Sequence, residues 1–393
     1  MNDRLAVDAS LIRERRSRLT MHSTATATLL LVPLVMAVLM PNIPAKAQSP
    51  VATSSIAGDE RIDFFTTGAM LSDNGAHWIV PIHGRVYRPV RSTLRRGSLA
   101  ALLKRAYGIA PVGEDRLRLD SRLNLLLSDN KGGRRIVIEL AGNSYMLPVS
   151  AGDGHVTARL TVPVADLDRV TTAGRAMFKA RLVPRDPRTF SGTVLMVPPE
   201  GRSVISDIDD TIKITHVTNR ARLMEATFAK EFEAVPGMAK VYQGWTASGV
   251  TIHYVSSTPW HLYRPMTEFL EVAGFPPATV TLKQIRLKDS SIANLLADAT
   301  TTKPPGIEAI LQAYPRRTFV LVGDSGEKDP EIYAGFMRRY PQRIERILIR
   351  NVTGAKAGDA RLAAAFAGLD PARWQLFDDA SELPQALVTV MTR

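Results

Sequence analysis

The sequence predicts an α/β half, with a parallel sheet and helices on both of its faces, preceded by a smaller β-rich, sandwich-like half. Three observations lead to this prediction. The length of 393 residues suggests two domains. Residues 61–199 contain short alternating apolar runs with Gly, Asn and Asp between them, which is typical of an antiparallel sandwich. In residues 200–393, apolar strands alternate with helical stretches, which is typical of a parallel sheet.

Residues 1–47 have the pattern of a secretion signal, and a polar linker follows over residues 48–60. Several arginines precede the apolar run Leu29–Met40, and Ala45–Ala47 fits the small-x-small cleavage pattern. The run is too short to span a bilayer unless it stays uncleaved and is extended by its flanks, which would make it a membrane anchor. Met21 is an alternative start, because everything that a signal needs follows it. We therefore expect an exported protein, periplasmic or envelope-associated in a bacterium.

The charge distribution separates the two halves. The formal net charge is +12. Residues 48–200 carry 21 basic and 14 acidic side chains, whereas residues 201–393 carry 23 and 21. A basic module suggests an anionic partner such as phospholipid, nucleic acid or an envelope polymer, although a solvated basic face is the plain alternative. The basic run from Arg85 to Arg105, near Trp78 and Tyr87, would suit docking on an anionic membrane surface. No nucleic-acid motif accompanies it, so nucleic acid is not an expected partner. The chain has no cysteine, which excludes disulfides and thiolate metal sites and is compatible with a bacterial periplasm.

The elements expected in the β-rich half follow the apolar alternation. The expected strands are Trp78–Tyr87, Arg135–Leu140, Val156–Val162, Ala176–Val183 and Ser191–Val197. Turns are expected at Asp129–Gly133 and Ala151–Gly154, where Gly, Asn and Asp gather. One helix, about Ser98–Tyr107, interrupts the strands.

The elements expected in the α/β half alternate between the two types. One expected strand ends in the run Val204–Ser206. The other expected strands are Val250–Ser256, Val280–Leu287, Phe319–Val322 and Arg343–Ile349. The expected helices are Arg220–Glu233, Met238–Ser248, Leu262–Ala273, Pro305–Tyr314 and Asp329–Tyr340. Gly274 is placed to end one helix, and Pro305 to begin another where its missing N–H is harmless. Because sites in such sheets lie beyond the carboxyl ends of the strands, the polar residues after the strands should converge on one crevice.

The stretch Val204–Thr211 carries the strongest chemical signal, because a short β-branched run ends there in three carboxylates and a threonine. Carboxylates side by side raise one another's pKa values, and a hard divalent cation makes such a group tolerable. Residues two apart in an extended segment point the same way, so Asp207, Asp209 and Thr211 could project into one crevice. The alternative is an Asp-rich turn that caps a helix.

Three later stretches favour the cation-binding interpretation. Ile252–Trp260 is an expected strand that ends in hydroxyl side chains. Lys303 lies just ahead of the helical run Ile307–Ala313. Thr318–Asp329 is an apolar strand followed by acids. The four stretches thus bring carboxylates, hydroxyls and one lysine to strand ends, in a fixed order along the chain.

The order D-x-D-x-T, strand–Ser, Lys and GD-x₄-D resembles that of the haloacid dehalogenase-like (HAD) phosphatases. Within this superfamily, V-I-S-D-I-D-D-T-I-K, H-Y-V-S-S-T-P-W and V-G-D-S-G-E-K-D-P-E-I-Y resemble the actin-patch-protein type of Mg²⁺-dependent phosphatidate phosphatase. The resemblance covers residues 200–385 well and residues 60–200 more loosely. It implies a HAD-like (Rossmannoid) parallel sheet and Mg²⁺ as the cofactor.

The resemblance also implies catalytic roles for five residues. Asp207 is the expected nucleophile and would form an aspartyl-phosphate. Asp209 would protonate the leaving alkoxide and later activate water. Thr211 would shape the turn after the nucleophile. Ser256 and Lys303 would bind the oxygens of the transferring phosphoryl group.

The metal ligands implied by the resemblance are the carboxylates of Asp207 and Asp324 and the backbone carbonyl of Asp209. Asp329 would be a further ligand or would orient a metal-bound water, and Glu327 competes with it for this outer position. Three isolated histidines are not expected to form a ligand set: His216, His253 and His261.

Some assignments stay open at the sequence level. Ser257 or Thr258 could replace Ser256. Lys283 or Lys288 could stand in for Lys303. Asp210 falls on the opposite face from Asp209 by strand parity, so we expect it only to cap the next segment.

The gaps between the motifs leave little room for a cap. Ordinary helices and a strand account for both gaps, so we expect little or no cap and an open site. An open site suits a large or interface-embedded substrate. We therefore expect hydrolysis of phosphatidate to diacylglycerol at an anionic membrane surface. The alternatives are a phosphatase of the same mechanism acting on a soluble or polymer-linked phosphate, and a membrane-docking protein without catalysis.

Overall fold

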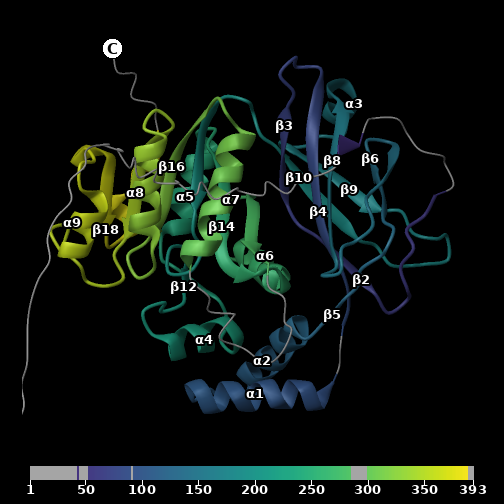
Figure 1. Ribbon diagram of the computed structural model, residues 1–393, viewed down its shortest axis with the longest axis horizontal. Helices are drawn as coiled ribbons and strands as arrows, with labels where there is room; N and C mark the ends of the chain where they lie inside the picture. Colours follow the sequence, from purple (N-terminus) through teal and green to yellow (C-terminus); the bar gives the residue numbers. More distant parts are fainter. Residues whose placement is uncertain (1–41, 44–51, 90–91, 285–298, 388–393) are drawn as a thin grey trace, which may run out of the picture. The chain divides into compact units, whose positions relative to one another are not determined.

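The computed structural model describes residues 42–43, 52–89, 92–284 and 299–387. These residues contain a ten-stranded sheet, a six-stranded sheet and a two-stranded sheet. Figure 1 shows the helices and strands in chain order by colour. Almost all of the predicted signal lies outside the described residues; its residues Asn42–Ile43 form β1, which pairs with β8. None of the helices in the described ranges has the length and hydropathy needed to cross a membrane.

The ten-stranded sheet belongs to the N-terminal half and is mainly antiparallel. Its order is β1-β8-β4-β3-β10-β9-β6-β7, with β2 and β5 also pairing with β4. The strands after β1 are β2 (Arg61–Phe64), β3 (Thr67–Leu71), β4 (His77–Arg88), β5 (Asp129–Asn130), β6 (Val137–Leu140), β7 (Asn143–Met146), β8 (His155–Pro163), β9 (Arg175–Ala180) and β10 (Ser191–Met196). All five strands predicted for this half are present, and the alternation along β9 buries every second side chain.

One hydrophobic cluster joins the two parts of this sheet. β3 and β10 pair in parallel and connect two antiparallel parts. Val80 from β4 and Ala158 from β8 share a buried cluster with Ile138 from β6 and Phe178 from β9. Inward-facing residues of both parts therefore pack together, as in the predicted sandwich-like arrangement.

Two details of this half differ from the prediction. The turn expected at Asp129–Gly133 begins with the two residues of β5, which pair with β4. Arg85, counted above with the basic docking run, is 2% exposed; its guanidinium donates to Asn130 Oδ1 at 2.8 Å and Ser128 Oγ at 2.5 Å. A strand residue that faces inward can carry a charge when it finds such partners, and sequence spacing does not show this.

A helical hairpin lies between β4 and β5. The predicted helix is present as α1 (Thr93–Tyr107); it begins earlier because the Ser92 side chain accepts from Arg95 N–H, and it ends where Gly108 has φ 72°. A second helix, α2 (Gly113–Leu126), was not predicted. Its buried leucines pack with α4 of the C-terminal half. The apolar stripe of α2 is interrupted by charged residues, so its partner is tertiary rather than local.

The six-stranded sheet belongs to the C-terminal half and is entirely parallel, as predicted. Its order is β15-β14-β11-β16-β17-β18. The strands are β11 (Gly201–Ser206), β14 (Thr251–Pro259), β15 (Thr279–Lys283), β16 (Arg317–Asp324), β17 (Ile344–Arg350) and β18 (Trp374–Phe377). β11 lies between β14 and β16, so the carboxyl ends of these three strands meet at one edge.

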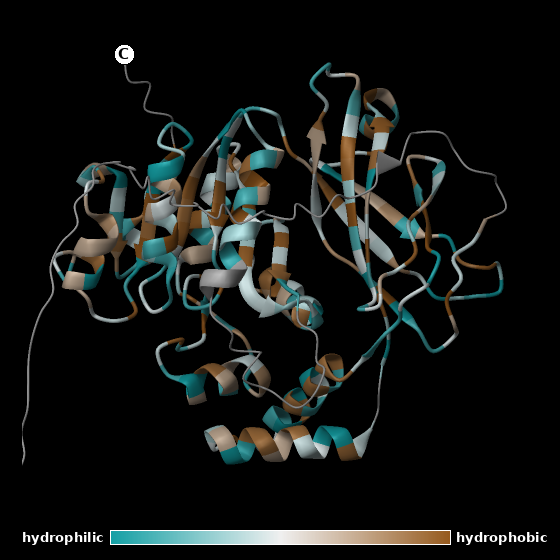
Figure 2. Cartoon of the chain, in the orientation of Figure 1, coloured by the Kyte–Doolittle hydropathy of each residue, from teal (hydrophilic) through white to brown (hydrophobic). Residues whose placement is uncertain are grey.

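Helices cover both faces of this sheet. They are α5 (Met238–Ala247), α6 (Tyr263–Val272), α7 (Ala299–Ala313), α8 (Asp329–Arg339) and α9 (Ala360–Phe366), whereas α4 (Arg220–Phe228) packs with α1 and α2. Val204 packs in a cluster with α5 and α6, whereas its neighbour Ile205 packs in a cluster with α7, α8 and α9. Successive strand residues point to opposite faces, so this division is what a doubly covered parallel sheet requires. The hydrophobic residues of the sheet are drawn in brown in Figure 2.

The largest differences in element boundaries concern α4, α7 and β15, and α9 and β18 were not predicted. α4 ends at Phe228, and Glu233 instead begins β13 (Glu233–Ala234), which pairs with β12 (Lys213–Ile214). α7 begins at Ala299, so Pro305 lies inside the helix rather than at its start. β15 ends at Lys283, and residues 285–287 of the predicted strand lie outside the described ranges.

Candidate active site

Three buried carboxylates gather at the carboxyl edge of the parallel sheet. Asp207 follows β11, Asp324 ends β16, and Asp329 is the first residue of α8. One oxygen from each lies within 4.8 Å of the others. None of the three residues is more than 1% exposed. The sheet order therefore brings together three of the four acids predicted as metal ligands.

Gly323 allows Asp329 to approach the end of β16. A Cβ atom on Gly323 would lie 2.2 Å from Asp329 Oδ2, which is far inside van der Waals contact. The same oxygen accepts a hydrogen bond from the backbone N–H of Asp324 at 3.2 Å. The glycine in V-G-D is thus required for close packing of the carboxylate on the strand.

Lys303 supplies the positive charge of this cluster. Its Nζ lies 3.1 Å from Asp207 Oδ1, 2.5 Å from Asp329 Oδ1 and 2.8 Å from Glu327 Oε2. Lys303 is fully buried and lies within α7, not ahead of the helix as predicted, because α7 begins earlier. Of the two alternatives, Lys283 ends the edge strand β15 and Lys288 lies outside the described residues. Glu327, considered as a competitor of Asp329, joins the same lysine.

The cluster carries more negative charge than one lysine can balance. Burial raises the pKa of Asp207 well above its usual value, although Lys303 opposes the shift. Burial and the neighbouring Asp329 likewise raise the pKa of Asp324. Burial alone would lower the pKa of Lys303, but the surrounding carboxylates, Asp207 first, raise it well above its usual value. Such a group favours either bound protons or a bound cation.

One carboxylate oxygen of this cluster is buried without a hydrogen-bond partner among the described residues. Asp324 Oδ1 accepts from the backbone N–H groups of Gly326 at 2.6 Å and Glu327 at 2.9 Å. Asp324 Oδ2 is buried and makes no hydrogen bond within the described part of the chain. This oxygen lies beside two further carboxylates, and hard divalent cations prefer carboxylate oxygens as ligands. The residues present therefore fit such a cation.

The carboxylate of Asp209 does not join the cluster. Its Oδ2 accepts from Ser256 Oγ at 3.1 Å and from Thr258 Oγ1 at 3.0 Å. Ser256, which the resemblance assigns to a phosphoryl oxygen, thus donates to Asp209 in this structure. Ser256 and Thr258, treated above as alternatives, thus donate to the same carboxylate oxygen. Ser257 Oγ is buried and has no hydrogen-bond partner among the described residues.

Lys213 completes the surroundings of Asp209 and was missed in the sequence. Its Nζ lies 2.8 Å from Asp209 Oδ1 and 4.4 Å from the ring centroid of Phe232. Burial alone would raise the pKa of Asp209, but Lys213 and the hydroxyl donors lower it. The available signal was a lysine between two apolar residues, Ile212 and Ile214, four positions after Asp209. A lysine in such a place needs a buried anionic partner.

The remaining residues of the D-x-D-D-T segment hold the backbone and the predicted nucleophile in place. Thr211 Oγ1 donates to Asp207 Oδ2 at 3.2 Å. Asp210 has φ 52°, and its carboxylate accepts from the N–H groups of Thr215, His216 and Val217 at 2.6–2.9 Å. The prediction that Asp210 caps the next segment is confirmed. The left-handed backbone of Asp210 is strained for a non-glycine residue, and these three hydrogen bonds compensate.

The two carboxylates proposed to act on the substrate are buried. Asp207 is 1% exposed and Asp209 is 8% exposed. The gaps between motifs gave no sign of further helices at this edge, because α1 and α2 come from upstream of the first motif. These helices pack against α4 and Leu262, which follow β11 and β14 at their carboxyl ends. The possible metal-ligand group in the described ranges consists of Asp207, Asp324 and Asp329.

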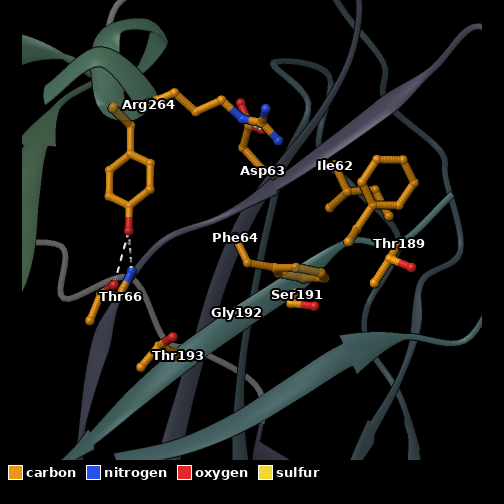
Figure 3. A pocket seen from close by; sticks show the side chains of 11 residues that line it. Ile62, Asp63, Phe64, Thr66, Thr189, Ser191, Gly192, Thr193 and Arg264 are labelled. Carbon is orange, nitrogen blue, oxygen red and sulfur yellow. Dashed lines mark hydrogen bonds and ion pairs between the residues drawn. The ribbon is translucent and has the colours of Figure 1, made fainter. Parts of the chain in front are cut away.

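A separate pocket lies between the N-terminal sheet and α6, away from these carboxylates (Figure 3). Asp63 and Arg264 form an ion pair at 2.9 Å on its wall, and the Tyr263 hydroxyl bonds to Thr66. None of the predicted catalytic residues lines it. We therefore do not take it as the active site.

Comparison with known proteins supports the motif-based resemblance. Residues 202–351 match the family model of the phosphatidate phosphatase APP1 catalytic domain. The chain is 32% identical over 169 residues to Phosphatidate phosphatase APP1 of Saccharomyces cerevisiae. The aligned segment covers 42% of this chain and 28% of that protein. It is 29% identical over 168 residues to Uncharacterized protein C29B5.04c of Schizosaccharomyces pombe, covering 42% of this chain and 27% of that protein. The chain thus aligns with little more than a quarter of the length of these curated relatives.

Proposed function

We propose that this chain is a Mg²⁺-dependent phosphatidate phosphatase with a HAD-like fold. Its residues 202–351 form a phosphoric monoester hydrolase domain similar to the APP1 catalytic domain. The observation that carries the proposal is the group Asp207, Asp324 and Asp329 around Lys303 at the carboxyl edge of a parallel sheet. All the proposed site residues lie within the matched segment. The substrate class is supported by the printed name of the yeast relative and by the basic excess in residues 48–200.

Mg²⁺ would be held by Asp207, Asp324 and Asp329, together with the backbone carbonyl of Asp209 that the resemblance assigns. The unpartnered Oδ2 of Asp324 is the observation in favour of such a ligand. When bound, Mg²⁺ offsets the negative charge of the phosphate and of the clustered carboxylates.

The first step is attack of an Asp207 oxygen on the phosphorus, which breaks the bond to the leaving alkoxide and forms an aspartyl-phosphate. Thr211 fixes the orientation of the attacking carboxylate through its hydrogen bond to Oδ2. Lys303 reaches Asp207 Oδ1 and so lies where the charge of a transferring phosphoryl group would develop.

Asp209 would give a proton to the alkoxide and then take one from the water that hydrolyses the aspartyl-phosphate. The pairing with Lys213 lowers the pKa of Asp209, which suits the second of these tasks. Protonation of the leaving group requires that Asp209 first exchange this pairing for contact with the substrate oxygen. Ser256 and Thr258, which bond to Asp209 in this structure, would be released by the same exchange and become available to phosphoryl oxygens.

Phosphate release from phosphatidate in detergent mixed micelles tests the proposal. Wild type and Asp207→Asn are compared with and without Mg²⁺. We expect release that needs Mg²⁺, follows the surface concentration of the lipid and is lost in the variant. Release from a soluble aryl phosphate alone, still dependent on Asp207, would retain the chemistry and reject the lipid substrate. No release from either compound would favour a docking protein without catalysis.

Export is a separate proposal, because the predicted signal in residues 1–47 lies almost entirely outside the described residues. The proposed location is the periplasm or envelope of a bacterium, where an anionic phospholipid surface is available. N-terminal sequencing of the expressed protein tests it. A mature chain that begins after Ala47 would support cleavage, an intact N-terminus in the membrane fraction would support an anchor, and an intact N-terminus in the cytosol would contradict export.

A further inference from the structure

The outer face of α1 combines exposed leucines with polar and basic side chains. Leu94 is 80% exposed and Leu102 is 36% exposed. Leu94, Ala101 and Arg105 are spaced so that they share one face of the helix, and Leu102 lies beside them. Exposed leucines on a helix face need a second observation, such as neighbouring charge, before they indicate a partner. Figure 2 shows hydrophobic and hydrophilic residues interleaved along α1.

The same hairpin holds two more exposed apolar side chains. Val112, in the turn between the helices, is 83% exposed, and Leu117 of α2 is 70% exposed. With Leu94 and Leu102, four of the nine exposed large hydrophobic side chains fall between residues 93 and 126. Four of the remaining five, Val149, Val170, Met177 and Val183, lie in residues 149–183, so exposed apolar side chains alone do not single out the hairpin and its charges must be considered with them.

The charge of α1 is entirely positive. The helix contains Arg95, Arg96, Lys104 and Arg105 and no acidic residue. Arg96 is held by Asp120 at 3.4 Å, on the side of α1 that faces α2. Lys104 and Arg105 are exposed and form no ion pair with any described residue. Leucines beside unpaired lysine and arginine match an anionic phospholipid surface, which offers both an apolar layer and negative headgroups.

The inner face of the hairpin is bonded to the α/β half, so the outer face is its free side. Arg122 of α2 donates to the carbonyl oxygens of Thr227 at 3.0 Å and Lys230 at 2.7 Å. Lys230 pairs with Asp115 at 2.7 Å, and Arg118 pairs with Glu231 at 3.2 Å. These contacts fix the hairpin on the segment between α4 and β13.

The attachment point lies next to the candidate active site. Arg122 lies over one ring, that of Phe232, at 3.8 Å from the centroid. Lys213 lies 4.4 Å from the same centroid and pairs with Asp209. Phe232 thus connects the hairpin to the carboxylate proposed as the acid and base. α1 and α2 are at the bottom of Figure 1, next to α4.

We propose that the outer face of α1, with Leu94, Leu102, Lys104 and Arg105, is the surface by which the chain docks on an anionic phospholipid membrane. This inference deepens the proposed function, because it assigns the element that brings the carboxylate edge of the sheet to a lipid surface. The rest of the basic N-terminal half is not needed for it; Arg85, for instance, is buried.

The test is binding of the full chain to vesicles, measured by flotation in the Asp207→Asn background so that no turnover alters the lipid. The vesicles contain equimolar phosphatidylcholine and phosphatidylglycerol, or phosphatidylcholine alone, and no phosphatidate. The double variant Leu94→Ser/Leu102→Ser should weaken partitioning to anionic vesicles by about tenfold or more. Lys104→Ser/Arg105→Ser should weaken binding to the anionic vesicles only, with a smaller dependence on salt.

The matched control is Met177→Ser/Val272→Ser, which removes two hydrophobic side chains of similar exposure, 66% and 89%, from other elements. Its binding should equal that of the parent. Thermal unfolding checks that the variants fold, which matters most for Leu102, since it is only 36% exposed. Equal binding of the leucine variant and the control would overturn the proposal, as would a parent chain that binds neither kind of vesicle. A dimer in sedimentation that the leucine variant converts to a monomer, without vesicle binding, would assign the face to a second copy instead.

Phosphate release from a soluble aryl phosphate by the chain with an intact Asp207 keeps this test separate from the proposed function. The leucine variant should retain that release. Loss of vesicle binding with full release would support the docking face, whereas loss of both would point to a structural effect on the site and overturn it.

Discussion

Two fully buried lysines, Lys303 and Lys213, neutralise the candidate site in different ways. Lys303 faces three carboxylates, of Asp207, Glu327 and Asp329, so an excess of negative charge remains around it. Lys213 faces the single carboxylate of Asp209 and an aromatic ring, so the charge there is balanced. The pKa of Asp207 is accordingly raised by burial, whereas that of Asp209 is lowered by Lys213 despite its burial.

The difference teaches how two acids two residues apart can take different roles. Environments that push the pKa values of neighbouring acids apart are what separate acid–base roles in enzymes. The region around Lys303 needs a further cation to be balanced, and the region around Lys213 does not. We therefore assign cation binding and nucleophilic attack to the first region, and proton transfer to the second.

Lys303→Met should have the largest effect of the variants that probe this comparison. Removal of the ammonium group leaves three carboxylates unbalanced and takes away a group next to the transferring phosphoryl, so kcat/KM should fall by roughly 10³-fold. Breaking a buried ion pair also costs about 3–5 kcal/mol of folding free energy. Thermal unfolding therefore accompanies the assay, and Lys303→Arg, which keeps the charge, should fold better than Lys303→Met. A loss of activity smaller than that of the Lys213 variant would reverse the ranking of the two lysines.

Lys213→Met should lower kcat by roughly 10²-fold and change its pH dependence. Without Lys213 the pKa of Asp209 is no longer lowered, so Asp209 becomes ionised only at a higher pH. The acid limb of the kcat profile, which reports the ionised base, should therefore move to higher pH. Lys230→Met is the control, because Lys230 also pairs with an aspartate but is half exposed. An acid limb that does not move would remove Lys213 from the proton-transfer region.

Gly323→Ala should damage the Lys303 region and leave the Lys213 region intact. The added methyl group would displace the Asp329 carboxylate, which lies 2.2 Å from the position of the new Cβ. We expect a loss of about 2 kcal/mol in the free energy of unfolding, as for other overpacked sites. Gly335→Ala on α8 is the control, since nothing lies within 4 Å of its added Cβ. Denaturant unfolding of both variants measures the difference, and equal stabilities would show that the close approach at Gly323 is not required.

Added Mg²⁺ should stabilise the fold more at pH 8 than at pH 6. Burial raises the pKa values of Asp207, Asp324 and Glu327 above their values in the unfolded chain. The folded protein then binds more protons than the unfolded one. Without a cation, its stability therefore falls as the pH rises from the unfolded-state pKa values of these groups through their higher folded-state pKa values. A bound cation replaces those protons, and the difference in stabilisation between the two pH values should be about 1 kcal/mol. Thermal unfolding of wild type and Asp324→Asn measures it; an equal Mg²⁺ effect in both proteins would place the cation elsewhere.

Much of this architecture could be predicted from the sequence, because strand ends are local features. Asp207, Asp324 and Lys303 were all found from motif order, and the parallel sheet then brings them together. Lys213 was missed because its pairing depends on the path of the chain through β12 and β13, two strands of two residues each. The bonding of Ser256 to Asp209 likewise depends on the register of β14 beside β11.

The helices show the same limit. α1 was predicted in part, over about residues 98–107, and the caps that bound it at Ser92 and Gly108 are local features. α2 was missed because its buried leucines pack against α4, about 100 residues further along the chain. The packing of the hairpin against α4 could not be predicted from gap lengths either, since the hairpin precedes the first motif.

The most direct test of the central claim is rapid quenching of the wild-type chain with ³²P-labelled phosphatidate in mixed micelles, followed by identification of the labelled peptide. We predict a hydroxylamine-sensitive label on Asp207 that forms only with Mg²⁺, is absent from Asp207→Asn, and persists longer in Lys213→Met because Asp209 no longer activates water efficiently. Turnover of the substrate with the label on another residue, or with the same label in Asp207→Asn, would contradict the assignment of Asp207 as the nucleophile.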